Sequence, residues 1–208
     1  MLIDLHLHVL PHSTDSFLSL EAAVLKAKER GLDAICVTDH DSMGLRERAA
    51  AFTRETGFPV LVGVEYFSLQ GDITAFGVDS FPDHRVPAQA FIDLVNAQGG
   101  FCVACHPFRN NGRGLGTHLG QVKGLHAAEV LNGSTIMEAN RQALRWCREL
   151  GLKTIGASDA HVEKQVGIYA TWLPHRVHNM ADLVAQLHGE RPRPAIWNGE
   201  SYDVTEDF

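Results

Sequence analysis

Short apolar runs alternate along this chain with longer segments of helical pattern, and this alternation constrains the fold more than any other feature. Each run is too short for a buried helix and is followed by polar residues, which is typical of strands buried on both faces of a parallel sheet. The runs lie at residues 34–37, 60–64, 101–105, 127–131 and 153–157.

Helices are predicted between and after these strands, at about 19–30, 43–56, 87–98, 136–150 and 180–188. A strand–helix alternation of this kind predicts an α/β fold with right-handed crossovers. Residues 66–69 and 73–78, on either side of Gln70-Gly71-Asp72, form a predicted hairpin. Seven candidate strands fit either a small closed barrel or a doubly wound open sheet.

Composition narrows the function classes. The chain has 208 residues with no linker or repeat, so we expect one domain over 1–208. A net charge of −7 argues against long nucleic acid as a partner. No apolar run reaches the roughly 20 residues of a membrane span, and the N-terminus lacks a signal-peptide pattern. We therefore expect no membrane partner, a cytoplasmic location and free thiols for the four cysteines.

Potential metal ligands follow the predicted strands. The first strand leads into Asp4-Leu-His-Leu-His8, where His6 and His8 share one face because side chains alternate along a strand. The later strands end near further ligand types, namely Asp39, His40, Glu65, His106, Asp159 and His161. Parallel strands deliver their carboxyl ends to one face of a barrel, so the sequence predicts a metal site there.

These motifs resemble those of the polymerase and histidinol phosphatase (PHP) family of metal-dependent phosphoesterases. The resemblance covers Asp4–His8, Thr38-Asp39-His40, Gly63-Val64-Glu65, His106-Pro107 and Ser158-Asp159-Ala160-His161, in that order. It implies a distorted seven-stranded (β/α)7 TIM-like barrel with its metal site at the C-terminal ends of the strands. It also implies a small phosphorylated substrate and two to three divalent ions, which could be zinc, manganese or iron.

The resemblance further implies how the ions are held. His6, His8, Glu65 and Asp159 would hold the first ion, and Glu65 would bridge to a second ion on His106. A third would take His40, His161 and a residue from the loop after His8, where Asp15 is favoured and His12 is the alternative. Many relatives have a further histidine ligand for the second ion, and our alignment places Thr74 at that position. A hydroxyl is a poor substitute for imidazole, so the sequence predicts a weakened second site.

Several residues are candidates for catalysis. Besides Glu65, which would fix the spacing of two ions, His161 and His12 could protonate the leaving group. Arg109 follows His106 in a Pro-Phe-Arg setting and could clamp a phosphoryl group, as could Arg113. Asn132, at the end of a strand, could contact the substrate, whereas Glu129 is expected to point into the barrel wall.

Two other interpretations stay open. An amidohydrolase-type C–N hydrolase also begins with His-x-His on a barrel strand, although a bridging lysine would be expected there. A non-catalytic metal-binding regulatory domain would explain the threonine at 74. By contrast, Cys102-Val-Ala-Cys105-His106 matches a haem-attachment pattern but lies in an apolar run, so buried thiols are expected.

Overall fold

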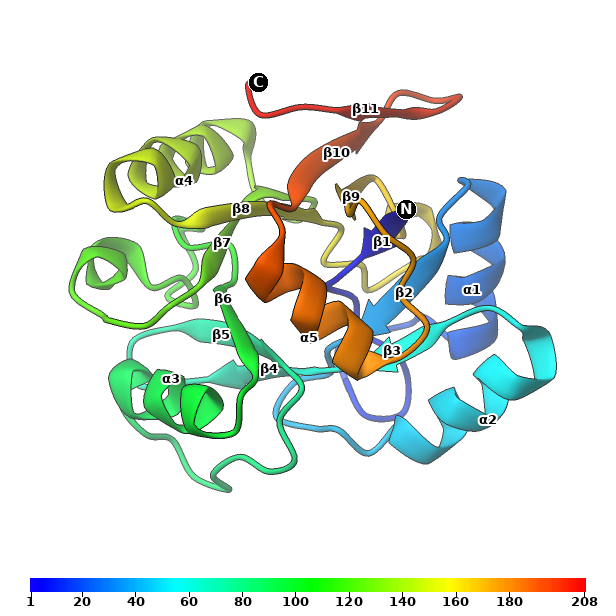
Figure 1. Ribbon diagram of the computed structural model, residues 1–208, viewed down its shortest axis with the longest axis horizontal. Helices are drawn as coiled ribbons and strands as arrows, with labels where there is room; N and C mark the ends of the chain where they lie inside the picture. Colours follow the sequence, from blue (N-terminus) through cyan, green and yellow to red (C-terminus); the bar gives the residue numbers. More distant parts are fainter.

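Two β-sheets face each other in the computed structural model, which describes all residues from 1 to 208 (Figure 1). The first sheet has the order β11 (Tyr202–Val204), β10 (Arg193–Trp197), β9 (Tyr169–Trp172), β1 (Leu2–Asp4), β2 (Ala34–Val37) and β3 (Val60–Val62). The second has the order β4 (Val64–Phe67), β5 (Asp72–Phe76), β6 (Phe101–Ala104), β7 (Ala127–Asn132) and β8 (Lys153–Ala157).

The sheets are mixed rather than parallel throughout. Strands β1, β2 and β3 are parallel to one another, as are β6, β7 and β8. The predicted hairpin forms the antiparallel pair of β4 and β5, and β6 is antiparallel to β5. At the other end of the chain, β9, β10 and β11 add antiparallel strands beside β1. The α/β class is confirmed, and the all-parallel sheet is corrected.

Two single bridges join the two sheets. Only Gly63 separates β3 from β4, and beside it His40 pairs with Glu65 in a parallel bridge. A second parallel bridge joins Leu7 to Ala160. His40, Leu7 and Ala160 follow the carboxyl ends of β2, β1 and β8, so the segments after these strands help to hold the two sheets together.

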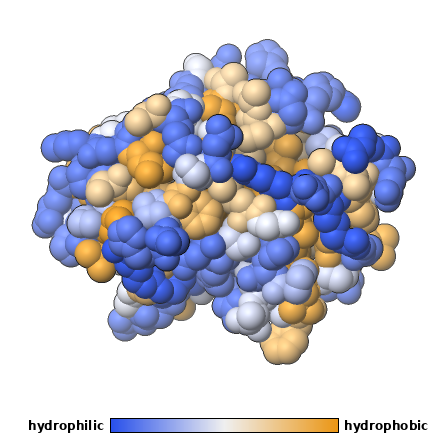
Figure 2. Space-filling model, turned by 90° about the horizontal axis from the view of Figure 1, so that it is seen from below, coloured by the Kyte–Doolittle hydropathy of each residue, from blue (hydrophilic) through white to orange (hydrophobic).

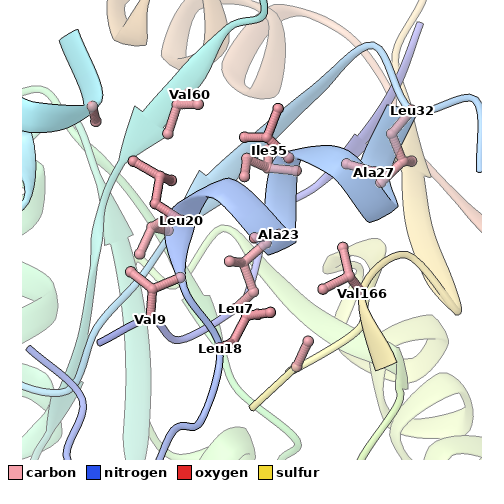
Figure 3. Packing of buried hydrophobic residues seen from close by; sticks show 14 of the residues in the cluster. Leu7, Val9, Leu18, Leu20, Ala23, Ala27, Leu32, Ile35, Val60 and Val166 are labelled. Carbon is pink, nitrogen blue, oxygen red and sulfur yellow. The ribbon is translucent and has the colours of Figure 1, made fainter. Parts of the chain in front are cut away.

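Four helices cover the outer faces of the sheets. In Figure 1, α1 (Leu20–Glu29) and α2 (Arg46–Thr56) flank the first sheet, and α3 (Ala88–Ala97) and α4 (Met137–Leu150) flank the second. Two short 3₁₀ helices, Gly116–Gly120 and Glu163–Gln165, lie in the loops. Ser19 caps α1, because its hydroxyl oxygen accepts a hydrogen bond from the backbone N–H of Ala22 at 3.2 Å. Figure 3 shows how Ala23 and Ala27 of α1 pack against Ile35 and Leu7.

The fifth helix, α5 (Met180–Gly189), closes one end of the space between the sheets (Figure 1). Its Leu183 and Leu187 belong to the apolar cluster of the interior, with Phe101 from the second sheet and Ile3 from the first. The Lys153 ammonium, at the start of β8, donates to the carbonyls that end this helix. The helix therefore covers the N-terminal ends of the parallel strands and leaves their carboxyl ends to polar residues.

The boundaries of several elements differ from prediction. Strand β1 ends at Asp4 rather than His8, and the Asp4 carboxylate accepts hydrogen bonds from backbone N–H groups of Ser158 and Gly167. The run at 60–64 is split at Gly63, whose missing side chain makes room for the Ala75 carbonyl. Strand β11 was not predicted.

None of the helices is both long and apolar enough to cross a membrane. Figure 2 shows the face below α2 and α3, where hydrophilic residues predominate and hydrophobic ones are interspersed among them.

Candidate metal centre

Nearly all the metal ligands predicted from the sequence lie together at the polar end of the interior. These side chains come from segments far apart in the chain and meet beyond the carboxyl ends of the strands, opposite α5. The residues brought together are His6, His8, Asp15, His40, Glu65, His106, Asp159 and His161.

Four buried side chains form a first constellation around one point. The Nε2 atom of His6 lies 3.0 Å from Nε2 of His8. Oε2 of Glu65 lies 3.5 and 3.3 Å from these two nitrogens, and Oδ1 of Asp159 lies 3.5 and 3.2 Å from them. All four residues are at most 1% exposed.

These separations match the edges of a coordination polyhedron. Zinc-type ions bind nitrogen and oxygen at about 2.0–2.2 Å, so neighbouring ligand atoms in a tetrahedral or octahedral shell lie about 3.0–3.5 Å apart. In addition, Oε2 of Glu65 is buried and makes no well-formed hydrogen bond, although Nδ1 of His40 also lies 2.7 Å from it. The constellation therefore fits a divalent cation better than it fits a network of hydrogen bonds.

Electrostatics also call for a cation at this point. Burial opposes protonation of His6, but the carboxylates of Glu129, Asp159 and Glu65 outweigh it and hold the His6 pKa well above its ordinary value. Burial lowers the pKa of His8 to about 4. Although burial alone would raise the pKa values of Asp159 and Glu65, His6 and neighbouring histidines hold both well below their ordinary values. The carboxylates therefore favour positive charge at this point.

Outer contacts orient the two central histidines. Nδ1 of His6 lies 2.6 Å from Oε1 of the buried Glu129. Nδ1 of His8 lies 3.2 Å from the Ser13 hydroxyl, which donates to Asp39 at 2.8 Å. Such partners fix the ring orientation of metal-ligating histidines. Glu129, expected in the barrel wall, points into the site instead, because it lies on the inner face of β7.

A second constellation lies beside the first. Nε2 of His106 is 3.1 Å from Oε1 of Glu65 and 3.8 Å from Oδ2 of Asp72. Ligand atoms of Glu65, Asp72 and His106 all lie within 4.8 Å of one another. Thr74 is buried, but its hydroxyl is directed to the Val103 carbonyl at 3.5 Å. Asp72 was not recognised from the sequence, where it was assigned to a hairpin turn.

A third constellation is more exposed. Oδ2 of Asp15 lies 3.1 Å from Nε2 of His40 and 3.4 Å from Nε2 of His161. The His8 ring stacks against those of both His40 and His161, at centroid distances of 4.2 and 4.3 Å. His12 lies elsewhere, with its ring packed over Gly44. The loop after His8 therefore delivers Asp15 and not His12.

A hollow of about 380 Å³ opens onto these constellations, and every residue that lines it is polar or charged. Arg109 and Arg113 form part of its wall. Arg109 is ion-paired with Asp159, and its Nε donates to the Thr135 hydroxyl at 3.1 Å. Arg113 donates from Nε to Oδ2 of Asp72 at 2.7 Å.

Asn132 does not reach the hollow, contrary to prediction. It is fully buried, and its Nδ2 donates to Oε2 of Glu129 at 2.7 Å and to Oδ2 of Asp159 at 3.3 Å. Its Oδ1 accepts from Arg109 at 2.6 Å. Asn132 therefore supports the outer contacts of the site, since its polar atoms are engaged by the protein.

The backbone is left-handed at two of the central residues. His106 has a φ of 29° and Asp159 a φ of 52°. Such values are uncommon for residues with a side chain and concentrate at functional sites. They turn the chain sharply at the ends of β6 and β8, which directs both side chains inward.

Comparison with known sequences identifies one segment. Residues 137–192 match the sequence model of the family described as PHP-associated. An uncharacterised protein of Methanocaldococcus jannaschii is 25% identical over 141 residues, which make up 64% of this chain and 82% of that protein.

Solved structures share the fold. A candidate metal-dependent phosphoesterase from Bifidobacterium adolescentis superposes with a TM-score of 0.67 at 16% identity, over 90% of this chain and 96% of that one. An amidohydrolase from Chromobacterium violaceum superposes with a TM-score of 0.66 at 19% identity, over 89% of this chain and 96% of that one. At such identities the likeness concerns the fold alone.

Proposed function

Since this chain belongs to the PHP family, we propose that it is a metal-dependent phosphoesterase that hydrolyses a small phosphomonoester or a short phosphodiester. One observation carries the proposal: the buried Nε2 atoms of His6 and His8 lie 3.0 Å apart, and each lies 3.2–3.5 Å from a carboxylate oxygen of Glu65 and of Asp159. That spacing suits a divalent cation, and divalent cations are the usual means of activating water against a phosphoester.

The proposed architecture is a distorted seven-stranded barrel formed by a single domain over residues 1–208. The two single bridges support it, because they join the segment after β2 to β4 and the segment after β1 to the segment after β8. The cyclic order would then be β1, β2, β3 with β4, β5, β6, β7 and β8. Strands β9 to β11 would extend the first sheet outside the ring.

The proposed ligand sets follow the constellations. His6, His8, Glu65 and Asp159 would hold the first ion, and Asp15, His40 and His161 would hold another on the exposed side. Glu65 and His106 would hold a further ion in the second constellation, beside Asp72. This gives two to three ions of zinc, manganese or iron, because imidazole and carboxylate together suit these metals.

When bound, the ions would neutralise the charge of the phosphoester and lower the pKa of an attacking water. The protein's part is to orient the substrate and to supply a proton. Nε and Nη2 of Arg109 are engaged by the protein, which leaves Nη1 for a phosphoryl oxygen. His161 lines the hollow with a side chain 25% exposed, so it could reach the leaving-group oxygen. His12 lies outside the hollow and is not assigned this role.

The hollow supports a small, charged substrate. Its volume of about 380 Å³ lies near the lower end of the range for small-molecule sites. A net charge of −7 argues against long nucleic acid. No lysine lines the hollow, so the bridging lysine expected of an amidohydrolase has no counterpart in its wall.

The test is a phosphatase assay on metal-free protein reloaded with manganese, iron or zinc, alongside Glu65→Gln. We expect turnover of small phosphomonoesters or short phosphodiesters with at least one metal. Glu65→Gln should lose bound metal and activity together, because its carboxylate contacts two constellations. If no phosphoester is turned over while metal still raises the melting temperature, a regulatory metal-binding domain is the better description.

A further inference from the structure

The second constellation lacks the histidine that relatives place there, and the strand register shows why Thr74 cannot replace it. Thr74 is directly opposite Glu65 in the β4–β5 pair, and Asp72 is opposite Phe67. Because side chains alternate along a strand, Asp72 and Thr74 lie on the same face as Glu65. The short threonine side chain turns to the Val103 carbonyl, whereas Asp72 reaches His106.

Asp72 is an unusual carboxylate for a protein interior. It is 1% exposed, and its Oδ1 atom has no hydrogen-bond donor. A buried polar atom without a partner is costly, so the unpaired Oδ1 of Asp72, whose Oδ2 lies 3.8 Å from Nε2 of His106, indicates a missing binding partner.

We propose that Asp72 is a direct ligand of the second metal ion and takes the place of the histidine absent at position 74. The inference rests on the proposed function, because it assigns a ligand within the same metal centre. The second ion would be held by Glu65, Asp72 and His106, whose ligand atoms lie within 4.8 Å of one another.

Charge balance supports this assignment. A carboxylate in place of a neutral imidazole adds one negative charge to the site, and Arg113 supplies one positive charge beside it. The Arg113 Nε donates to Oδ2 of Asp72 at 2.7 Å, which leaves Oδ1 unpaired by protein. The guanidinium of Arg113 also lies 4.0 Å from the ring centre of Phe67, the residue paired with Asp72.

The local backbone fits Arg113 to this position. The N–H of Asp72 donates to the Arg113 carbonyl at 2.6 Å. At Gly71 a side chain would collide with the backbone of Arg113 and Gly114 at 2.7–2.8 Å, so the loop can approach only because residue 71 is glycine. The loop and the start of β5 are thus built to bring Arg113 to Asp72.

The donor set indicates the kind of ion. Two carboxylates and one imidazole form a harder set than the two histidines and two carboxylates of the first constellation. Hard oxygen donors suit manganese more than zinc. We therefore expect the second site to prefer Mn²⁺ over Zn²⁺ more strongly than the first site does.

Titration of the metal-free, full-length protein with Mn²⁺ tests the inference by calorimetry and by electron paramagnetic resonance. Wild type should bind at least two Mn²⁺ ions and show a spin-coupled signal, since the two sites share Glu65. Asp72→Asn should weaken the second site at least about 100-fold, more than the 10–100-fold typical of an outer contact, and leave an uncoupled signal. Asp41→Asn is the matched control, because Asp41 lines the same hollow outside the constellations.

The outcomes separate this inference from the proposed function. A wild-type protein that binds no Mn²⁺ would refute the metal centre itself. If wild type shows the coupled pair and Asp72→Asn keeps it with unchanged affinity, Asp72 is not a ligand and the phosphoesterase proposal stands. Should Asp72→Asn fail to fold, anomalous scattering from Mn²⁺-soaked wild-type crystals decides. Manganese about 2.0–2.3 Å from a carboxylate oxygen of Asp72 is expected, and manganese bound without that contact overturns the inference.

Discussion

Two groups of histidines lie at opposite ends of the interior, and the same side chain has a different role in each. At the carboxyl ends of the strands, His6 and His8 face Glu65 and Asp159 within 3.5 Å. Near the N-terminal ends, His126 stacks on Phe101 with ring centroids 4.7 Å apart, and the edge of His188 meets its ring. No carboxylate pairs with His126 in the structure.

The surroundings therefore decide what each imidazole does. Carboxylates outweigh burial at His6 and hold its pKa well above the ordinary value, so that place attracts positive charge. Burial, together with the neighbouring His188 and Lys153, lowers the pKa of His126 to about 4. His126 instead accepts a hydrogen bond from the backbone N–H of Cys102 at 3.1 Å. Histidine count alone could not have separated a metal centre from a structural stack.

The largest effect is expected on activity, from removing a charged ligand at the carboxyl ends of the strands. Asp159→Asn keeps the size of the side chain and tolerates the left-handed backbone, but it removes one ligand of the first constellation. We expect phosphatase activity to fall by about 10³-fold or more, because both binding and activation of the water depend on that ion. Metal content and kcat are the measurements. Asp203→Asn, on exposed β11, should leave both unchanged.

Shortening a side chain near the N-terminal ends of the strands should instead affect stability. Phe101 is fully buried between the sheets and contacts both His126 and His188. Phe101→Ala should lower the free energy of unfolding by about 3–5 kcal/mol, the usual cost of a large cavity. Urea unfolding measures this cost, while metal content per folded molecule should not change. A marked loss of metal in the folded variant would show that the two ends are coupled.

An outer contact should have a smaller effect than a ligand. Glu129→Gln preserves the shape but removes the carboxylate 2.6 Å from Nδ1 of His6. We expect metal affinity to fall by about 10–100-fold, the range for such partners of ligating histidines. Competition with a chelator measures this affinity. Glu149→Gln, the same change at an exposed position of α4, is a control that should not alter it. Unchanged affinity in Glu129→Gln would mean that backbone geometry alone orients His6.

The sequence predicted the positions of the helices and strands better than the direction and pairing of the strands. Apolar runs and glycine or serine boundaries located β2, β6, β8 and the five helices to within a few residues, because burial and capping are local signals. The mixed direction of the strands depends on long-range pairing, such as β9 beside β1, which no local pattern encodes.

The same limit applies to the site. Motif residues were placed near one another, but the position of His12 over Gly44 and the burial of Asn132 follow from tertiary packing. Asp72 was missed because Gln-Gly-Asp is a typical turn sequence. A polar residue at the start of a strand that is otherwise apolar was the available signal, since an unpaired carboxylate is rarely buried there.

The smallest predicted effect is the pH dependence that His126, near the N-terminal ends of the strands, gives to the stability of the protein. The pKa of His126 is lowered to about 4 in the folded protein from the ordinary 6.5. Above pH 6.5 the ring is neutral in both states and costs nothing. As the pH falls from 6.5 towards 4, the unfolded chain takes up a proton that the folded chain excludes, so stability decreases over this range.

His126→Asn keeps an acceptor for the Cys102 N–H and removes the titration. Urea unfolding at several pH values should therefore give a shallower loss of stability below pH 6.5 in this variant than in wild type. Identical slopes would show that His126 is protonated as easily in the folded protein as in the unfolded one, and the contrast between the two histidine groups would then rest on contacts alone.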